Sequence, residues 1–258
     1  MRRQELPSPP ATPESATPAH NMARSFNGSS AYLEAASAAV VLLPFTMACW
    51  FKPANITTAK ALVSIGTSGG TDRLSLVENQ VSGLGGCFAS VNVVGTSESS
   101  VAGTVVAGAW QHFSAVFTSS SNRQAYFQGV AGTANTNTIT PSGMNRTVIG
   151  ARINAGSYGG NAAGEIADVG IWSVALAVSE IASLARGARP TSIRPESLVF
   201  YNPLDDRWTY DRARGIFLTD VGPTGAAEDP PFLKKPRRKY FIFGSSAVAR
   251  RKTIMIFP

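Results

Sequence analysis

The chain has 258 residues and a formal net charge of +7, with 44% hydrophobic and only 15% charged residues. This composition excludes a wholly disordered protein and is typical of one turn-rich β domain with terminal extensions. No segment is apolar enough for a secretory signal or a transmembrane helix, so we expect no membrane partner. The two cysteines, Cys49 and Cys87, exclude a disulfide-dense scaffold, and we expect buried thiols in a protein made in a reducing cytosol.

Residues 1–23 are predicted to be an extended, proline-rich arm. Prolines alternate there with Ser, Thr and Ala, a composition that favours polyproline conformations and cannot build a hydrophobic core. The arm is expected to contact partners rather than to fold alone.

Residues 24–206 are predicted to form a single β-sandwich, because short β runs are separated by Gly, Ser, Asn and Pro. In Phe45 to Lys52 both alternating faces are apolar, which predicts an inner strand. The other predicted strands are a hairpin at 110–117 and 123–127, followed by 148–152 and 165–172. One short helix is expected from Ala177 to Arg186, with Glu180 near its start and Gly187 as its stop.

These elements carry a resemblance to a known family. The matching phrases are SFNGSSAYLE (25–34), FTMACWFKP (45–53), WQHFSAVF with QAYFQG (110–129), VIGAR (148–152) and GEIADVGIWSVALAVSEIASLARG (164–187). In this order they resemble the laminin-G-like branch of the concanavalin A-like lectin and glucanase superfamily. The resemblance implies an all-β, two-sheet antiparallel jelly-roll sandwich, a fold that serves lectins, enzymes, receptors and virion proteins. Ala177 departs from the pattern, because relatives place a capping Ser there.

Residues with catalytic or ligand-binding chemistry are sparse. A retaining glycosidase needs two carboxylates on one face, whereas Glu165 and Asp168 are three apart and should point to opposite faces of a strand. We therefore expect no catalytic residues and no cofactor. The two acids are expected to close turns or to pair with Arg152, and Asp168 is expected to be a surface acid. Calcium requires six to eight oxygen ligands, and Asp168 is only a weak candidate ligand. His112 is expected to be structural, and Tyr158, in a glycine-rich loop, is a possible stacking contact for a glycan.

Residues 207–258 are predicted to be a C-terminal extension that ends in two basic, apolar docking strands. The cations there have no acidic neighbours within Pro231 to Pro258, and two groups of three cations are each followed by an apolar, strand-like run, although a solvated tail is the alternative. The predicted docking residues are Lys234, Lys235, Arg237, Arg238, Lys239, Phe241, Phe243, Arg250, Arg251, Lys252, Ile254 and Ile256.

The phrases LVFYNPLDD (198–206) and LTDVGPTGAAEDPP (218–231), followed by the basic strands, resemble the C-terminal extension of tailed-bacteriophage structural proteins. The leading hypothesis is a non-enzymatic virion protein, most simply a capsid decoration or cement protein. It would bind the major capsid protein or another virion protein, form a homo-oligomer, and be assembled in the host bacterial cytoplasm.

Two alternatives remain open at this point: a glycan-binding, lectin-like domain of a phage tail or fibre, and a glycoside hydrolase. Eight cations with nearby aromatics could also bind nucleic acid, but they flank the predicted strands instead of interleaving with the aromatics. We therefore rank an acidic protein surface above nucleic acid as the partner of the tail.

Overall fold

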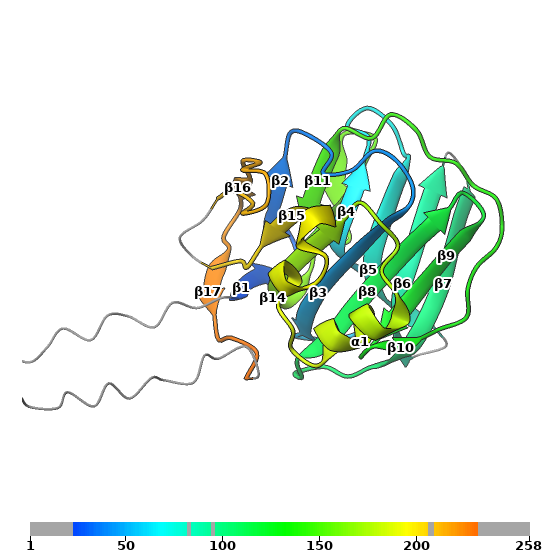
Figure 1. The fold of residues 1–258 in the computed structure, drawn as a ribbon. Coiled ribbons are helices and arrows are strands. Elements are labelled where there is room, and N and C mark those ends of the chain that lie inside the picture. The colour runs from blue at the N-terminus through cyan, green and yellow to red at the C-terminus, as the bar shows by residue number, and fades with distance from the viewer. Residues whose placement is uncertain (1–22, 82–83, 94–95, 206–208, 232–258) are drawn as a thin grey trace, which may run out of the picture.

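Two antiparallel sheets packed face to face form the body of the protein in the computed structural model (Figure 1). The structure describes residues 23–81, 84–93, 96–205 and 209–231. The predicted all-β jelly-roll sandwich is confirmed. The expected arm and the expected docking strands at residues 234–256 lie outside the described residues.

The larger sheet has eight strands in the order β10-β9-β8-β3-β14-β1-β17, with β15 pairing to β14 beside this path. Its strands are β1 (Ala23–Asn27), β3 (Phe45–Pro53), β8 (Gln111–Ser119), β9 (Asn122–Phe127), β10 (Val130–Ala131), β14 (Ala163–Trp172), β15 (Leu198–Asn202) and β17 (Gly225–Ala227).

The second sheet has seven strands in the order β16-β2-β11-β4-β5-β6-β7. Its strands are β2 (Tyr32–Ala35), β4 (Lys60–Gly66), β5 (Arg73–Val81), β6 (Leu84–Val93), β7 (Thr96–Val105), β11 (Arg146–Ile149) and β16 (Thr219–Val221). A short separate ribbon pairs β12 (Arg152–Asn154) with β13 (Ser157–Gly159).

Strand β3 shows how the sequence pattern builds the core. Phe45, Met47, Cys49 and Phe51 point into the core between the two sheets, whereas Trp50 packs in a separate cluster on the outer face. Strand β3 lies between β8 and β14, so its backbone hydrogen bonds are satisfied at both edges, and residues 45–51 are buried on both faces. The predicted inner strand is confirmed, as is the predicted hairpin of β8 and β9.

The helix α1 (Val178–Ala185) lies on the outer face of the eight-stranded sheet (Figure 1). Its buried Ile181 and Leu184 pack with Trp172 of β14 and Tyr126 of β9. At its start, the backbone N–H of Ala177 donates to Glu180 Oε2 at 2.7 Å, which is half of a capping box. The other half is missing because Ala177 has no side-chain oxygen. The 3₁₀ turns η1 (Pro190–Ser192) and η2 (Pro195–Ser197) follow the helix.

Replacing Ala177 with Ser should therefore complete the capping box and raise the free energy of unfolding by about 1 kcal/mol. The residue already has the extended backbone conformation of an N-cap, so the hydroxyl needs no rearrangement. Urea unfolding at equilibrium measures the gain. Ala177→Val, which has no acceptor, is the matched control and should show no gain. A Ser variant no more stable than the Val variant would contradict the prediction.

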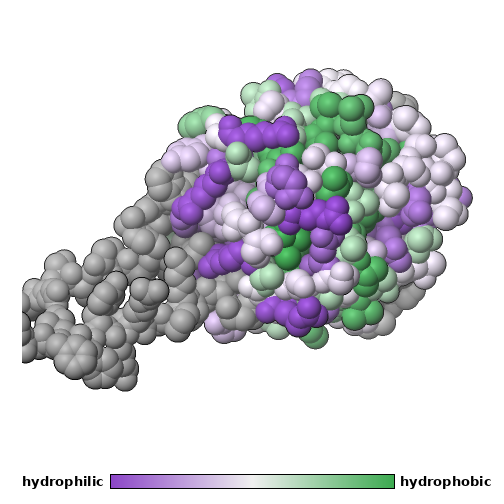
Figure 2. Space-filling view, in the orientation of Figure 1, coloured by the Kyte–Doolittle hydropathy of each residue, from purple (hydrophilic) through white to green (hydrophobic). Residues whose placement is uncertain are grey.

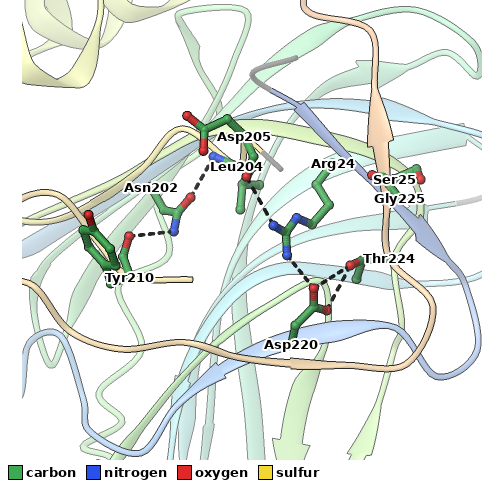
Figure 3. Close-up of polar contacts among 9 residues, drawn as sticks. All are labelled: Arg24, Ser25, Asn202, Leu204, Asp205, Tyr210, Asp220, Thr224 and Gly225. Atoms are coloured by element: carbon green, nitrogen blue, oxygen red, sulfur yellow. Dashed lines mark hydrogen bonds and ion pairs between the residues drawn. The ribbon is translucent and has the colours of Figure 1, made fainter. Parts of the chain in front are cut away.

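The C-terminal part of the described chain is built into the sandwich. Strand β16 extends the seven-stranded sheet beside β2, and β17 extends the eight-stranded sheet beside β1. A polar network holds this region, in which Arg24 of β1 donates to Asp220 Oδ2 at 2.8 Å and to the Asp205 carbonyl at 3.2 Å (Figure 3). The sandwich thus continues beyond Asp206, the predicted end of the domain. The sequence did not signal these short strands, because polar contacts rather than a long apolar run hold them.

The loop between β2 and β3 carries exposed apolar side chains. Val41 is 64% exposed and Leu42 is 76% exposed. Hydrophobic surface is visible at the top of the molecule in Figure 2, where Figure 1 places this loop. Elsewhere on this face, hydrophobic and hydrophilic residues are interspersed (Figure 2).

No helix among the described ranges is long and apolar enough to span a membrane.

Candidate functional site

The outer face of the seven-stranded sheet carries polar side chains at alternating positions of its strands. In β5, Leu74 and Leu76 point into the core, so the residues between them point outward. The register then places Ser75, Ser90 and Ser99 in one row across β5, β6 and β7. A neighbouring row contains Arg73, Asn92 and Ser97 in the same three strands.

Except for Ser75, which is buried, the residues of these rows line a groove made of two adjoining hollows of about 250 and 240 Å³. Three residues, Arg73, Asn92 and Ser97, line both hollows, so the two form one continuous depression. Its remaining lining residues are Thr71, Val77, Asn79, Phe88, Ser90, Val93, Thr96, Ser99, Arg152 and Asn154. The groove therefore combines a small apolar area with many hydrogen-bonding groups, the composition expected of a site for a polar ligand.

The β12–β13 ribbon forms one wall of this groove. Ile153 of β12 lies over Gly66 of β4, where a Cβ would come within 2.8 Å of the isoleucine side chain. Gly66 therefore permits the ribbon to approach the sheet closely. On either side of Ile153, Arg152 and Asn154 extend into the lining of the hollows.

The groove is electropositive. Among the residues that the structure describes, neither hollow has an Asp or Glu in its lining, whereas Arg73 and Arg152 both belong to it. Burial lowers the pKa of Arg73, and the positive charge of Arg152 lowers it further. The Ser, Thr and Asn oxygens of the lining can accept hydrogen bonds, and the two arginines attract negative charge. The described lining offers no carboxylate for acid or base catalysis.

Tyr158, the sequence-predicted glycan contact, lies in the other strand of the ribbon and does not line the groove. Its ring stacks on that of Tyr32 with centroids 4.2 Å apart. Burial raises the pKa of Tyr158, with further contributions from a hydrogen bond to Glu34 and from the charge of Glu34. The ring is partly buried rather than exposed on a loop, because its stacking partner comes from β2, a contact that local sequence does not encode.

Glu165 and Asp168 of β14 have separate, structural partners. Lys52 Nζ lies 3.2 Å from both carboxylate oxygens of Glu165. Asp168 is buried and accepts hydrogen bonds from Tyr201 at 2.7 Å and Arg189 at 3.1 Å. Neither acid pairs with Arg152, and Asp168 is not a surface acid, so both of those expectations are wrong. The strand alternation used to separate the two acids is also interrupted by a register shift, with Asp168 at φ 56°.

Asp168 does not form a calcium site. Its carboxylate is held by a cation and a hydroxyl, and burial raises its pKa although Arg189 opposes this shift. Within the described part of the chain, no cluster of three or more His, Cys, Asp or Glu could hold a metal ion. Among the described residues, Asp168 is therefore not part of a carboxylate cluster of the kind that calcium requires.

The remaining chemically distinctive residues are core components. His112 of β8 is 2% exposed, and its ring meets that of Trp50 edge-on with centroids 5.1 Å apart. Cys49 and Cys87 are buried free thiols, as expected. Burial raises the pKa of Cys87 to about 12, so it is a weak nucleophile.

The groove was not predicted from the sequence. A usable signal for a polar sheet face is the occurrence of polar residues two positions apart, as in Arg73 with Ser75 of β5, Ser90 with Asn92, and Ser97 with Ser99. Nothing local signals that Arg152 and Arg73 line the same hollow, because this depends on how the ribbon packs on the sheet.

Several solved structures share the fold at low sequence identity. A native heptameric pentraxin from Limulus polyphemus is 18% identical, with a TM-score of 0.53, over 63% of this chain and 81% of its own. A proposed carbohydrate-binding protein from Bacteroides ovatus is 15% identical, with a TM-score of 0.56, over 83% of this chain and 62% of its own. Domain 4 of an arabinanase from Geobacillus stearothermophilus, solved with arabinotriose, is 21% identical, with a TM-score of 0.52, over 63% of this chain and 76% of that chain.

No curated protein matches the chain. The family model described as the concanavalin A-like lectin/glucanases superfamily matches residues 27–182, which is more than half of the sequence. Its range runs from β1 into α1 and includes every strand that lines the groove. The chain therefore belongs to the concanavalin A-like lectin/glucanases superfamily.

Proposed function

We propose that this protein is a non-catalytic glycan-recognition domain that binds saccharides in the groove on the outer face of β5, β6 and β7. The observation that carries the proposal is the lining of the groove, in which serine and asparagine side chains surround a small apolar area. The fold neighbours include a proposed carbohydrate-binding protein and an arabinanase domain solved with arabinotriose, which favours this reading.

The lining suits the chemistry of a sugar ring. Hydroxyl and amide groups such as those of Ser99 and Asn92 can donate and accept hydrogen bonds, as the hydroxyls of a saccharide require. Val77 and Phe88 supply an apolar area against which the C–H groups of a pyranose face can pack. Hydrolysis would need two carboxylates across the scissile bond, and the lining supplies none. Binding without turnover is therefore the proposed activity.

Replacing Ser97 with Trp should abolish saccharide binding by filling the groove. Ser97 is exposed and lines both hollows, and an exposed strand position tolerates an aromatic residue. A glycan array with the full chain, followed by calorimetric titration of the strongest hits, measures the effect. Thr118→Trp is the matched control, because Thr118 is an exposed strand residue of the other sheet.

We expect the Thr118 variant to bind like the unmodified protein and the Ser97 variant to lose at least 10-fold in affinity. Equal affinity in both variants would place any sugar site outside the groove. An array on which the unmodified protein binds no saccharide would overturn the proposed function itself.

Attachment to a virion is a second candidate function, which the composition of the last 28 residues favours. This segment carries eight cations and no acid, a pattern that suits docking on an acidic particle surface. The described chain begins at β1 and ends just after β17, and these two strands are paired. Both terminal segments therefore join the sandwich at one sheet edge, so they could anchor one side of the domain. A gene position beside a major capsid gene would support decoration, and one among tail genes would favour a fibre.

A further inference from the structure

Among the residues that the structure describes, the groove is lined by two arginines and by no Asp or Glu. We propose that the site selects saccharides that carry an anionic group, a carboxylate or a sulfate ester, which Arg73 and Arg152 bind together. This inference rests on the proposed glycan-binding function and narrows it to one class of sugar.

Arg73 is fixed in place by neutral groups. Its residue is only 9% exposed, and Nη1 donates to the Thr71 carbonyl at 3.1 Å and to Asn154 Oδ1 at 2.8 Å. Both acceptors are uncharged, so the guanidinium is largely buried without a counter-ion among the described residues. A buried cation of this kind is stabilised by an anion, and a guanidinium binds carboxylate or sulfate oxygens through several N–H donors.

Arg152 brings a second positive charge to the same groove. It lines the hollow that also contains Arg73. Its backbone pairs with Gly159 in the ribbon, but its guanidinium forms no hydrogen bond or ion pair with another residue of the described ranges. Gly160, at φ 59°, lies directly against its guanidinium, where an added Cβ would be 3.3 Å from Cζ. The glycine therefore leaves room for this arginine beside the ribbon. Two cations without a shared acid repel each other, and a bound anion would relieve that repulsion.

The neighbouring acids are engaged elsewhere. Asp72 precedes Arg73 in the chain, but its carboxylate accepts a hydrogen bond from the Ser142 backbone N–H at 2.9 Å. Glu34, on the same sheet, forms an ion pair with Arg146 at 3.0 Å. Neither acid lines the groove, so the protein itself does not neutralise the two arginines there.

The test compares acidic and neutral forms of the same sugars by calorimetric titration of the full chain at physiological salt. Trigalacturonic acid and its fully methylated ester probe the carboxylate. N-acetyllactosamine with and without a 6-sulfate probes the sulfate ester. Because the chain has a net charge of +7, each probe is also titrated into Arg152→Gln and into Arg186→Gln, two variants of equal net charge. Arg186 is an exposed residue at the end of α1, on the opposite sheet.

We expect at least one acidic form to bind 10-fold or more tightly than its neutral partner. Arg152→Gln should remove that preference and Arg186→Gln should keep it. The acidic probe that binds more tightly shows whether the site prefers a carboxylate or a sulfate ester. Equal weakening by both variants would mean non-specific attraction and would overturn the inference. Equal binding of acidic and neutral forms would overturn the inference while the proposed function stands. If no saccharide binds here or on the array, the proposed function fails as well.

Discussion

Replacing Lys60 with Met should lower the free energy of unfolding by about 3–5 kcal/mol, the cost typical of removing one partner from a buried ion pair. Lys60 and Glu78 are both fully buried, with Lys60 Nζ 3.1 Å from Glu78 Oε2 and 2.8 Å from the Thr58 carbonyl. Without the ammonium, the Glu78 carboxylate is left in the interior without its counter-charge. Denaturant unfolding at equilibrium, followed by tryptophan fluorescence, measures the loss.

The double variant Lys60→Met/Glu78→Met is the control, because it removes both charges and leaves apolar side chains of similar size. It should lose less stability than Lys60→Met alone, since an apolar pair often replaces a buried ion pair with little loss. Losses that simply add would show that the two charges do not interact.

The pH dependence of the Lys60→Met variant follows from the carboxyl group that remains. Burial raises the pKa of Glu78, and Lys60 offsets part of this shift in the unmodified protein. An acid whose pKa is higher in the folded than in the unfolded state destabilises the fold as the pH rises between those two values. The loss caused by Lys60→Met should therefore be smaller at pH 5 than at pH 7.

His112 should make the fold sensitive to acid. Burial lowers the pKa of His112 to about 3, whereas an unfolded histidine titrates near 6.5. Between these values the unfolded state binds the extra proton, so the contribution is complete above about pH 6.5 and is lost as the pH falls toward about 3. Each pH unit in this window is worth about 1.4 kcal/mol, so the loss from pH 6.5 to pH 4 is about 3 kcal/mol.

The variant His112→Phe isolates this effect from the titration of carboxylates. Phenylalanine keeps a ring against Trp50 and removes Nδ1, which has no hydrogen-bond partner in the described structure. Measured by denaturant unfolding at pH 7 and pH 4, the unmodified protein should lose about 3 kcal/mol more than the variant over this range. Equal losses in the two proteins would mean that His112 does not titrate on unfolding.

Local sequence patterns were enough to predict the body of the fold. Phe45 to Lys52 is apolar on both alternating faces, which requires an inner strand, and the helix at 178–185 has its start set by Glu180 and its end by Gly187. These signals are local, because side-chain periodicity and turn residues act within a few positions along the chain. The small number of cysteines predicted that Cys49 and Cys87 are buried thiols, and both lie in the core between the sheets.

Which distant residues lie close together depends on how the sheets and the ribbon pack. The ribbon that carries Arg152 packs on the sheet that carries Arg73, 79 positions away in the sequence, and no local pattern encodes that approach. Likewise, β16 and β17 are three-residue strands, too short to be recognised by periodicity, and Arg24 holds β16 in place through Asp220. Asp168 shows the same limit, since a bulge in β14 overrides the alternation expected of a strand. Long-range pairing fixes these positions, so the candidate site became visible only once the sheets were packed.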